Sequence, residues 1–178
     1  MKKFFTGLAV LVLAIFVIFL AHVATLPDDW RIERSAAIQA PPEKIYPLIA
    51  DLQAMNRWNP FAQQDPSIKI AYGSVTSGKG ANYSWDSTGD AGKGHMEIVD
   101  TVPQTSVAMR LTMEKPMAAR NNVVFLLDPK GESTQVTWSM TGRHNFLTKT
   151  LCAIFNADQM VGGEFAKGLR ALKQMAEA

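Results

Sequence analysis

Side chains that could do acid–base chemistry are few in this sequence, and they are widely spaced. Asp158 interrupts a helical pattern at a position that should be apolar. If Asp158 faces a protein interior, the loss of water raises its pKa and makes it a candidate general base. Asp is also a favoured N-cap residue, so Asp158 could instead begin a helix. The sequence leaves both interpretations open.

A second group of polar side chains lies on two predicted strands. His95 and Glu97 share one strand face, and Arg110 lies opposite Met109 and its apolar neighbours on the next strand. Because side chains two apart share a face, these residues could form a polar cluster, with His95 as a second catalytic candidate. The same alternation is typical of the solvated outer face of a sheet. We therefore assign no catalytic residue from the sequence.

Sequence motifs of enzyme and metal sites are absent. There is no glycine-rich phosphate loop, no His-Glu-x-x-His pattern and no nucleophile elbow. Cys152 is the only cysteine, which excludes an internal disulfide and a cysteine-based metal cluster, and three scattered histidines do not indicate a metal site. We expect no metal and no cofactor. The net charge of +2 is spread without basic blocks, so nucleic acid is not an expected partner.

The elements that must position these side chains follow a simple order. A first strand is expected at 32–39 and short helices at 44–51 and 52–57. Residues 58–61 interrupt regular structure, because Pro60 disfavours a helical conformation at Asn59. Six further strands are expected at 67–73, 80–87, 94–101, 105–113, 122–128 and 134–141. The order indicates an α+β domain with one curled antiparallel sheet, in which strand 122–128, apolar on both faces, is covered on both sides.

Residues 147–176 carry apolar side chains at helical spacing, so they predict the helix that covers the apolar face of the sheet. Asp158 divides this stretch into helices at 147–155 and 159–176. Gly162 and Gly163 interrupt the second helix where packing would favour bulk. They could leave space for a ligand, or they could be tolerated at a cost of about 1 kcal/mol each relative to alanine.

The N-terminal stretch 4–26 contains no formal charge. As a helix it would extend roughly 34 Å, enough to cross a hydrocarbon core of about 30 Å. Lys2 and Lys3 precede it and favour a cytoplasmic N-terminus. We expect a cytoplasmic segment at 1–3, a transmembrane signal anchor at 4–26, a linker at 27–30 and a domain at 31–178 outside the cytoplasm, on a single-pass inner-membrane protein. A cleaved signal peptide is the alternative, although His22 makes the Ala21–Ala24 stretch a poor cleavage site.

Six short motifs in residues 31–177 together resemble one known superfamily. They are Glu-Arg-Ser at 33–35, Ala-Pro-Pro-Glu-Lys-Ile at 40–45, Trp-Asn-Pro-Phe at 58–61, Gly-Lys-Gly-His-Met-Glu-Ile at 92–98, Thr-Gln-Val-Thr-Trp at 134–138 and Phe-Ala-Lys-Gly-Leu at 165–169. In order and spacing they resemble the START-like, or SRPBCC, superfamily, in its polyketide cyclase/dehydrase branch. The resemblance implies a helix-grip fold, in which a curved antiparallel sheet wraps round a long C-terminal helix and leaves a cavity between them.

Members of this superfamily bind lipids, sterols, hormones and polyketides in that cavity, and a minority catalyse reactions there. The resemblance therefore implies a ligand site in this chain, although aromatic residues at such positions are also typical of an ordinary core. The expected ligand-binding residues are Trp58, Phe61, Tyr83, Trp85, Arg110, Trp138, Asp158, Gly162 and Phe165.

Three functions stay open at this stage. The leading hypothesis is a membrane-anchored module that binds a small hydrophobic ligand, either lipid-like or aromatic and polyketide-like. The second is a cyclase or hydrolase that uses general acid–base chemistry in the cavity. The third is an envelope interaction protein with a vestigial cavity. Fold alone does not choose between them, and the oligomeric state is not indicated.

Overall fold

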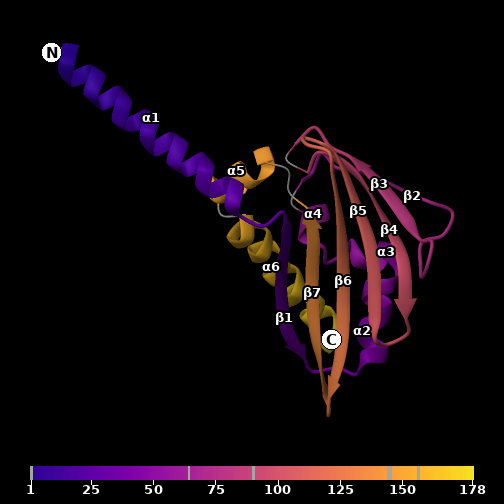
Figure 1. Cartoon of the computed structure of the whole chain (residues 1–178). Helices are drawn as coiled ribbons and strands as arrows, with labels where there is room; N and C mark the ends of the chain where they lie inside the picture. Colours follow the sequence, from indigo (N-terminus) through magenta and orange to yellow (C-terminus); the bar gives the residue numbers. More distant parts are fainter. Residues whose placement is uncertain (1, 64, 90, 144–145, 156) are drawn as a thin grey trace. The chain divides into compact units, whose positions relative to one another are not determined.

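The computed structural model describes residues 2–63, 65–89, 91–143, 146–155 and 157–178 (Figure 1). The chain divides into two units. The smaller contains Met1–Trp30 and Arg143–Ala157, and the larger contains Arg31–Gly142 and Asp158–Ala178. The larger unit holds the sheet and the long C-terminal helix that the sequence predicts.

Seven strands form one sheet in the order β1-β7-β6-β5-β4-β3-β2. Their bounds are β1 Asp29–Ile38, β2 Lys69–Tyr72, β3 Asn82–Asp86, β4 Lys93–Val102, β5 Ser106–Lys115, β6 Ala119–Lys130 and β7 Ser133–Arg143. All neighbouring pairs from β2 to β7 are antiparallel. Figure 1 shows the long strands curving together, with β1 and β2 at the two ends of the sheet. The predicted number and order of strands is confirmed.

Side chains of the long strands alternate between a buried and a more exposed face, as expected for an antiparallel sheet packed on one side. On β6, Val123, Phe125 and Leu127 are buried, whereas Leu126 between them is 44% exposed. The prediction that this strand is covered on both faces is therefore wrong. The apolar run is unbroken because Leu126, although apolar, lies on the exposed outer face.

Short helices follow β1, as predicted, at α2 (Pro42–Ala50) and α3 (Leu52–Met55). Asp51 caps α3, because its carboxylate accepts the backbone N–H groups of Gln53 and Ala54 at 2.8 and 2.9 Å. A further helix, α4 (Pro60–Gln63), begins where the sequence predicts irregular structure. Pro60 restricts the residue before it but is tolerated in the first turn of a helix, so α4 begins at the proline itself.

The long helix α6 (Ala157–Glu177) buries one stripe of its side chains, including Phe165, Leu169, Leu172 and Ala176. The spacing of three and four residues puts these side chains on one helix face. Gly168 lies on the same face, and a Cβ there would stand 2.7 Å from Cζ3 of the Trp138 indole. A glycine is therefore required for the close contact between α6 and the sheet.

Side chains of α6 bond to backbone groups at the C-terminal end of β1, an edge strand of the sheet. β1 is the last strand of the sheet, so the backbone groups on one of its sides have no strand partner. Lys173 Nζ donates to the Ala37 carbonyl at 2.8 Å, and the Gln39 N–H donates to Glu177 Oε1 at 2.6 Å. These two residues of α6 thus bind one backbone group at the end of β1 and one just after it.

The smaller unit contains α1 (Lys2–Thr25) and α5 (Phe146–Phe155). Within α1, Phe4–Thr25 has a mean hydropathy of 2.9 and is long enough, by length and composition, to cross a membrane. Lys149 of α5 is only 8% exposed, and its Nζ lies 2.7 Å from the Leu26 carbonyl and 2.6 Å from Asp28 Oδ1. Hydrogen bonding to Lys149 lowers the pKa of Asp28 below its ordinary value of 3.8. A cation at the C-terminal end of a helix is also favoured by the helix dipole.

Candidate functional site

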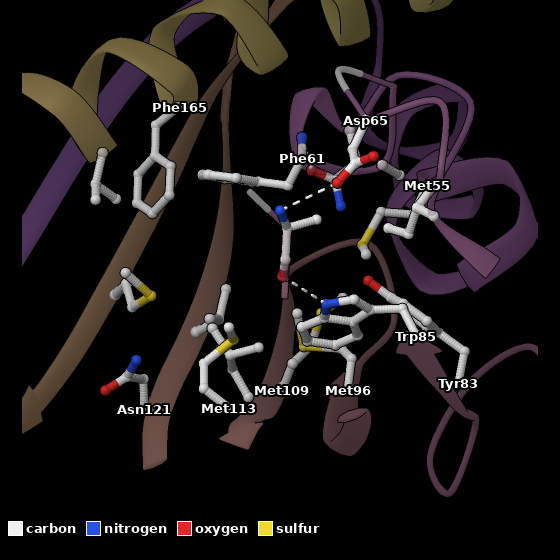
Figure 2. A pocket seen from close by; sticks show the side chains of 18 of the residues that line it. Met55, Phe61, Asp65, Tyr83, Trp85, Met96, Met109, Met113, Asn121 and Phe165 are labelled. Carbon is white, nitrogen blue, oxygen red and sulfur yellow. Dashed lines mark hydrogen bonds between the residues drawn. The ribbon is translucent and has the colours of Figure 1, made fainter. Parts of the chain in front are cut away.

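A cavity of about 650 Å³ lies inside the larger unit, between the inner face of the sheet, the segment around α4, and α6 (Figure 2). Most of the side chains around it are apolar. Its lining residues are Met55, Trp58, Asn59, Phe61, Ala62, Asp65, Pro66, Ile68, Tyr83, Trp85, Gly89, Ala91, Met96, Met109, Leu111, Met113, Asn121, Val123, Phe125, Trp138, Met140, Val161 and Phe165.

Strand register explains which side chains meet in the cavity. Leu111 on β5 is paired with Met96 on β4 and with Asn121 on β6, and Met96 is paired with Tyr83 on β3. Residues paired across an antiparallel sheet point to the same face, so these four side chains form one row across four strands. With a strand spacing of about 4.8 Å, the row is roughly 14 Å long.

An aromatic cluster closes the cavity on the side of α6. The rings of Trp138 and Phe165 are stacked, with centroids 4.1 Å apart and planes 8° apart. Phe61 meets both rings edge-on, at 6.4 and 6.3 Å. Phe61 is 41% exposed, so it separates the buried pair from solvent. Trp58 packs against Trp138 from another direction, at 5.7 Å and 87°.

Five methionines supply much of the remaining wall: Met55, Met96, Met109, Met113 and Met140. Methionine side chains are unbranched and polarizable, so they adapt to different apolar shapes. Figure 2 shows Met96, Met109 and Met113 on the floor of the cavity, with Met55 on the wall below Asp65. This wall suits apolar surfaces of more than one shape.

Asp65 is the single acidic residue among the described lining residues, and its carboxylate is fully engaged. One oxygen accepts the backbone N–H of Ser67 at 2.9 Å and its hydroxyl at 2.6 Å, and the other accepts the Ser87 hydroxyl and the Ala91 N–H. These hydrogen bonds, with that from Ser67 first, hold the pKa of Asp65 well below its ordinary value of 3.8. Asp65 is therefore an ionised structural group that ties two loops together, not a general base.

Two asparagines line the cavity, and they differ in whether the side-chain amide is hydrogen-bonded within the protein. Asn59 Oδ1 accepts the Phe61 N–H at 3.2 Å, and its Nδ2 donates to Asn56 at 3.4 Å. Its amide is thus used within the protein. The side chain of Asn121 on β6 makes no hydrogen bond to any described residue, so its donor and acceptor are available inside the cavity.

The structure brings six of the expected ligand-binding residues together in the cavity lining: Trp58, Phe61, Tyr83, Trp85, Trp138 and Phe165. Each is buried except Phe61. Trp58 Nε1 donates to the Leu48 carbonyl and Trp85 Nε1 to the Ala91 carbonyl, which fixes both indoles. The Trp138 N–H is buried without an acceptor among the described residues.

Arg110 and His95 lie on the other face of the sheet. Arg110 is 53% exposed and pairs with Glu97 at 3.7 Å, directly across from it in the strand register. His95 alternates with the inward-facing Gly94 and Met96 on β4. Neither residue lines the cavity, so the polar cluster that the sequence offered is the solvated outer face.

Asp158 and Gly162 also lie outside the cavity lining. The Asp158 carboxylate is 60% exposed and faces the Arg34 guanidinium at 2.9 and 3.3 Å. That hydrogen bonding lowers the pKa of Asp158, which is the opposite of the shift that a desolvated general base would need. Asp158 lies within the first turn of α6 and not before it, so it is not the N-cap of this helix.

The space beside Gly162 is filled by the Arg34 side chain and is not part of the cavity. A Cβ at Gly162 would stand 2.1 Å from Arg34 Nη2, whereas a Cβ at Gly163 would have nothing within 4 Å. Gly162 therefore makes room for the ion pair between β1 and α6. The cavity instead meets α6 through Val161 and Phe165.

Asp65 and Asn121 are lining residues that the sequence did not single out. Asn121 lies one residue before the predicted strand, and the inward alternation of Val123 and Phe125 would have placed it on the cavity side if that strand had been extended. The Asp-Pro-Ser sequence at 65–67 is typical of a turn, but nothing nearby in sequence points to Ser87 and Ala91 as its partners.

A comparison with protein families matches residues 29–177 to the family described as polyketide cyclase / dehydrase and lipid transport. The match covers the whole sheet and α6. A search of curated proteins found no match.

Several solved structures share the fold at low sequence identity. The protein MLL2253 from Mesorhizobium loti is 15% identical, with a TM-score of 0.60, over 82% of this chain and 96% of that one. The Aha1 dimer from Colwellia psychrerythraea is 18% identical, with a TM-score of 0.59, over 83% and 96%. CalU16 from Micromonospora echinospora is 16% identical, with a TM-score of 0.55, over 85% and 80%. At these identities the likeness concerns the fold alone.

Proposed function

Because this chain belongs to the polyketide cyclase / dehydrase and lipid transport family of the START-like superfamily, we propose that it is a membrane-anchored module that binds a small hydrophobic ligand. The ligand is lipid-like or aromatic, and it occupies the cavity between the sheet and α6. The observation that carries this proposal is the cavity itself, about 650 Å³ in volume and walled by aromatic and methionine side chains.

The volume and the wall both support ligand binding. Small-molecule sites occupy about 300–1,000 Å³ and are mainly apolar with a few placed polar groups. A packed protein core contains few voids larger than a water molecule, so an interior space of this size is not ordinary packing. A vestigial cavity would be expected to have closed around its methionines.

The N-terminal helix supports anchoring. Phe4–Thr25 has the length and hydropathy of a membrane span. Val23 near its end is fully buried, and Lys149 binds the carbonyl of Leu26 just after it. Cleavage after Ala24 would remove the buried Val23, which supports a retained signal anchor at 4–26, a linker at 27–30 and a binding domain at 31–178. The two lysines at positions 2 and 3 favour a cytoplasmic N-terminus.

Ligand binding is tested on the full chain, purified in nanodiscs and compared with empty nanodiscs. We expect native mass spectrometry to show bound apolar molecules, and we expect an apolar fluorescent probe such as Nile red to bind the chain in a saturable way. Empty protein together with no saturable probe binding would refute the proposal.

Anchoring is tested by the mass of the intact chain recovered from membranes. The expected mass includes residues 1–24, and alkaline extraction should leave the chain in the membrane fraction. A mass that lacks those residues would show that the segment is a cleaved signal peptide.

A further inference from the structure

The charges around the cavity disfavour lipids that carry an anionic head group. Among the described lining residues there is no lysine, arginine or histidine, and the one charged side chain is Asp65. Asp65 is already ionised and satisfied by four donors from Ser67, Ser87 and Ala91, so it does not offer a bond to a ligand cation. Burial raises the pKa of the Tyr83 phenol, which therefore stays neutral.

A carboxylate or phosphate in this cavity would be a buried charge without a cation. Removing an unpaired anion from water is costly, and the negative charge of Asp65 adds repulsion. A neutral head group does not incur this cost. The lining therefore favours alcohols, ketones and amides over fatty-acid anions and phosphorylated lipids.

Asn121 supplies the group that recognises such a head. Its amide lies at one end of the row of Leu111, Met96 and Tyr83, and Figure 2 shows it at the opposite side of the cavity from Asp65. The amide offers one acceptor and two N–H donors, and no described residue uses them. A hydroxyl, carbonyl or amide of a ligand can bond to it, while the ligand body lies along the methionines.

We propose that the cavity selects neutral amphipathic molecules with one hydrogen-bonding head group, which Asn121 binds, and that it discriminates against anionic lipids. This inference rests on the proposed ligand-binding function and specifies its ligand class. Asn121 is a specificity-determining residue, and its neighbour Asn122 provides a matched control, because Asn122 is exposed on the opposite face of β6 and pairs with Arg110.

The test uses displacement of Nile red from the full chain in nanodiscs by dodecane, dodecanol and dodecanoate at about pH 8, where a carboxylic acid is ionised. Three chains are compared: wild type, Asn121→Leu and Asn122→Leu. Partition of each ligand into nanodisc lipid is the same for all three, so it cancels in comparisons between variants. Near-ultraviolet circular dichroism of the buried tryptophans reports folding, and Asn121→Val is a second variant if the leucine disturbs packing.

We expect Asn121→Leu to weaken dodecanol binding relative to dodecane by about fivefold to tenfold, the effect of one lost hydrogen bond. Asn122→Leu should leave this ratio unchanged. We expect dodecanoate to displace the probe at least about tenfold less well than dodecanol from wild type, after correction for its partition into empty nanodiscs. An unchanged dodecanol-to-dodecane ratio in Asn121→Leu and Asn121→Val, or dodecanoate binding as tight as dodecanol, would overturn the inference. Failure of all three ligands to displace the probe would refute the proposed function instead.

Discussion

The indole of Trp138 lies flat against the ring of Phe165, with 4.1 Å between centroids and 8° between planes. One residue is on β7 and the other on α6, so this stack joins the sheet to the helix that covers it. The Trp138 N–H has no acceptor among the described residues. It cannot bond freely to water either, because Trp138 is only 5% exposed. The stack thus combines strong apolar contact with an unsatisfied donor.

Trp138→Phe should therefore cost little stability. The substitution removes a buried donor without a partner, which offsets part of the lost contact area. Trp58→Phe is the matched control, since the Trp58 N–H donates to the Leu48 carbonyl at 2.8 Å in an equally buried position. We expect the free energy of unfolding to fall by about 1–3 kcal/mol more in Trp58→Phe than in Trp138→Phe, as measured by urea unfolding of the full chain in micelles. Equal losses would show that the Trp138 N–H is satisfied in solution.

Leu111→Trp should reduce ligand uptake by filling the cavity. Leu111 lines the cavity from β5, and a larger ring there occupies the volume in which a ligand would lie. Leu126→Trp is the control, because Leu126 is 44% exposed on the outer face of β6. We expect about a tenfold or greater loss of Nile red affinity for Leu111→Trp and little change for Leu126→Trp. Similar affinities for both variants would mean that the probe binds outside the cavity.

Alanine at the two adjacent glycines of α6 should have different effects. Gly163→Ala should raise the free energy of unfolding by about 1 kcal/mol, because a Cβ there meets nothing within 4 Å and alanine favours helix. Gly162→Ala should gain less, because its Cβ displaces Arg34 from Asp158. The exposed ion pair is worth about 0–1 kcal/mol, so the net gain at Gly162 lies between about zero and 1 kcal/mol. Urea unfolding of the two variants side by side measures the difference, and an equal gain would show that the ion pair contributes nothing.

Asp65 should make stability depend on pH in the acid range. Its pKa is lower in the folded chain than the ordinary 3.8, so the ionised carboxylate stabilises the fold fully above that value. The stabilisation declines as the pH falls below 3.8, because the unfolded chain takes up the proton first. The difference in unfolding free energy between wild type and Asp65→Ala should thus be largest at neutral pH and shrink below about pH 4. A difference that is constant with pH would contradict the hydrogen-bonded, ionised state of Asp65.

Lys149→Met should loosen the end of α1. Lys149 binds both the Leu26 carbonyl and Asp28, and it is nearly buried. We expect hydrogen–deuterium exchange of the amides at 23–26 to accelerate by about tenfold, the effect of losing a charge-assisted hydrogen bond. Lys167→Met, at an exposed lysine of α6, is the control and should leave exchange there unchanged. Unchanged protection in Lys149→Met would show that the lysine does not hold this segment.

The sequence predicts the order of the strands and the covering helix because both depend on local alternation and on the spacing of apolar residues. The alternation places Arg110 on the face opposite Met109, which is typical of the outer face, but alternation alone does not establish which face lines a cavity. Arg110 lies outside because Met109 and its neighbours take the inner face, and its register partner Glu97 on β4 lies on the same outer face. Asp65 bonds to Ser87 and Arg34 bonds to Asp158. Both partners are distant in sequence, so no local pattern predicts these contacts.

Side chains of Lys173 and Glu177 bond to backbone groups at the C-terminal end of β1, which is an edge strand of the sheet. An uncovered edge strand is a template on which another chain can add a strand and begin to aggregate. The last turn of α6 therefore hinders strand addition at this end of β1, and it also forms part of the core. Loss of that turn would leave most of the sheet in place and free the backbone groups of Ala37 and Gln39 at the end of an edge strand.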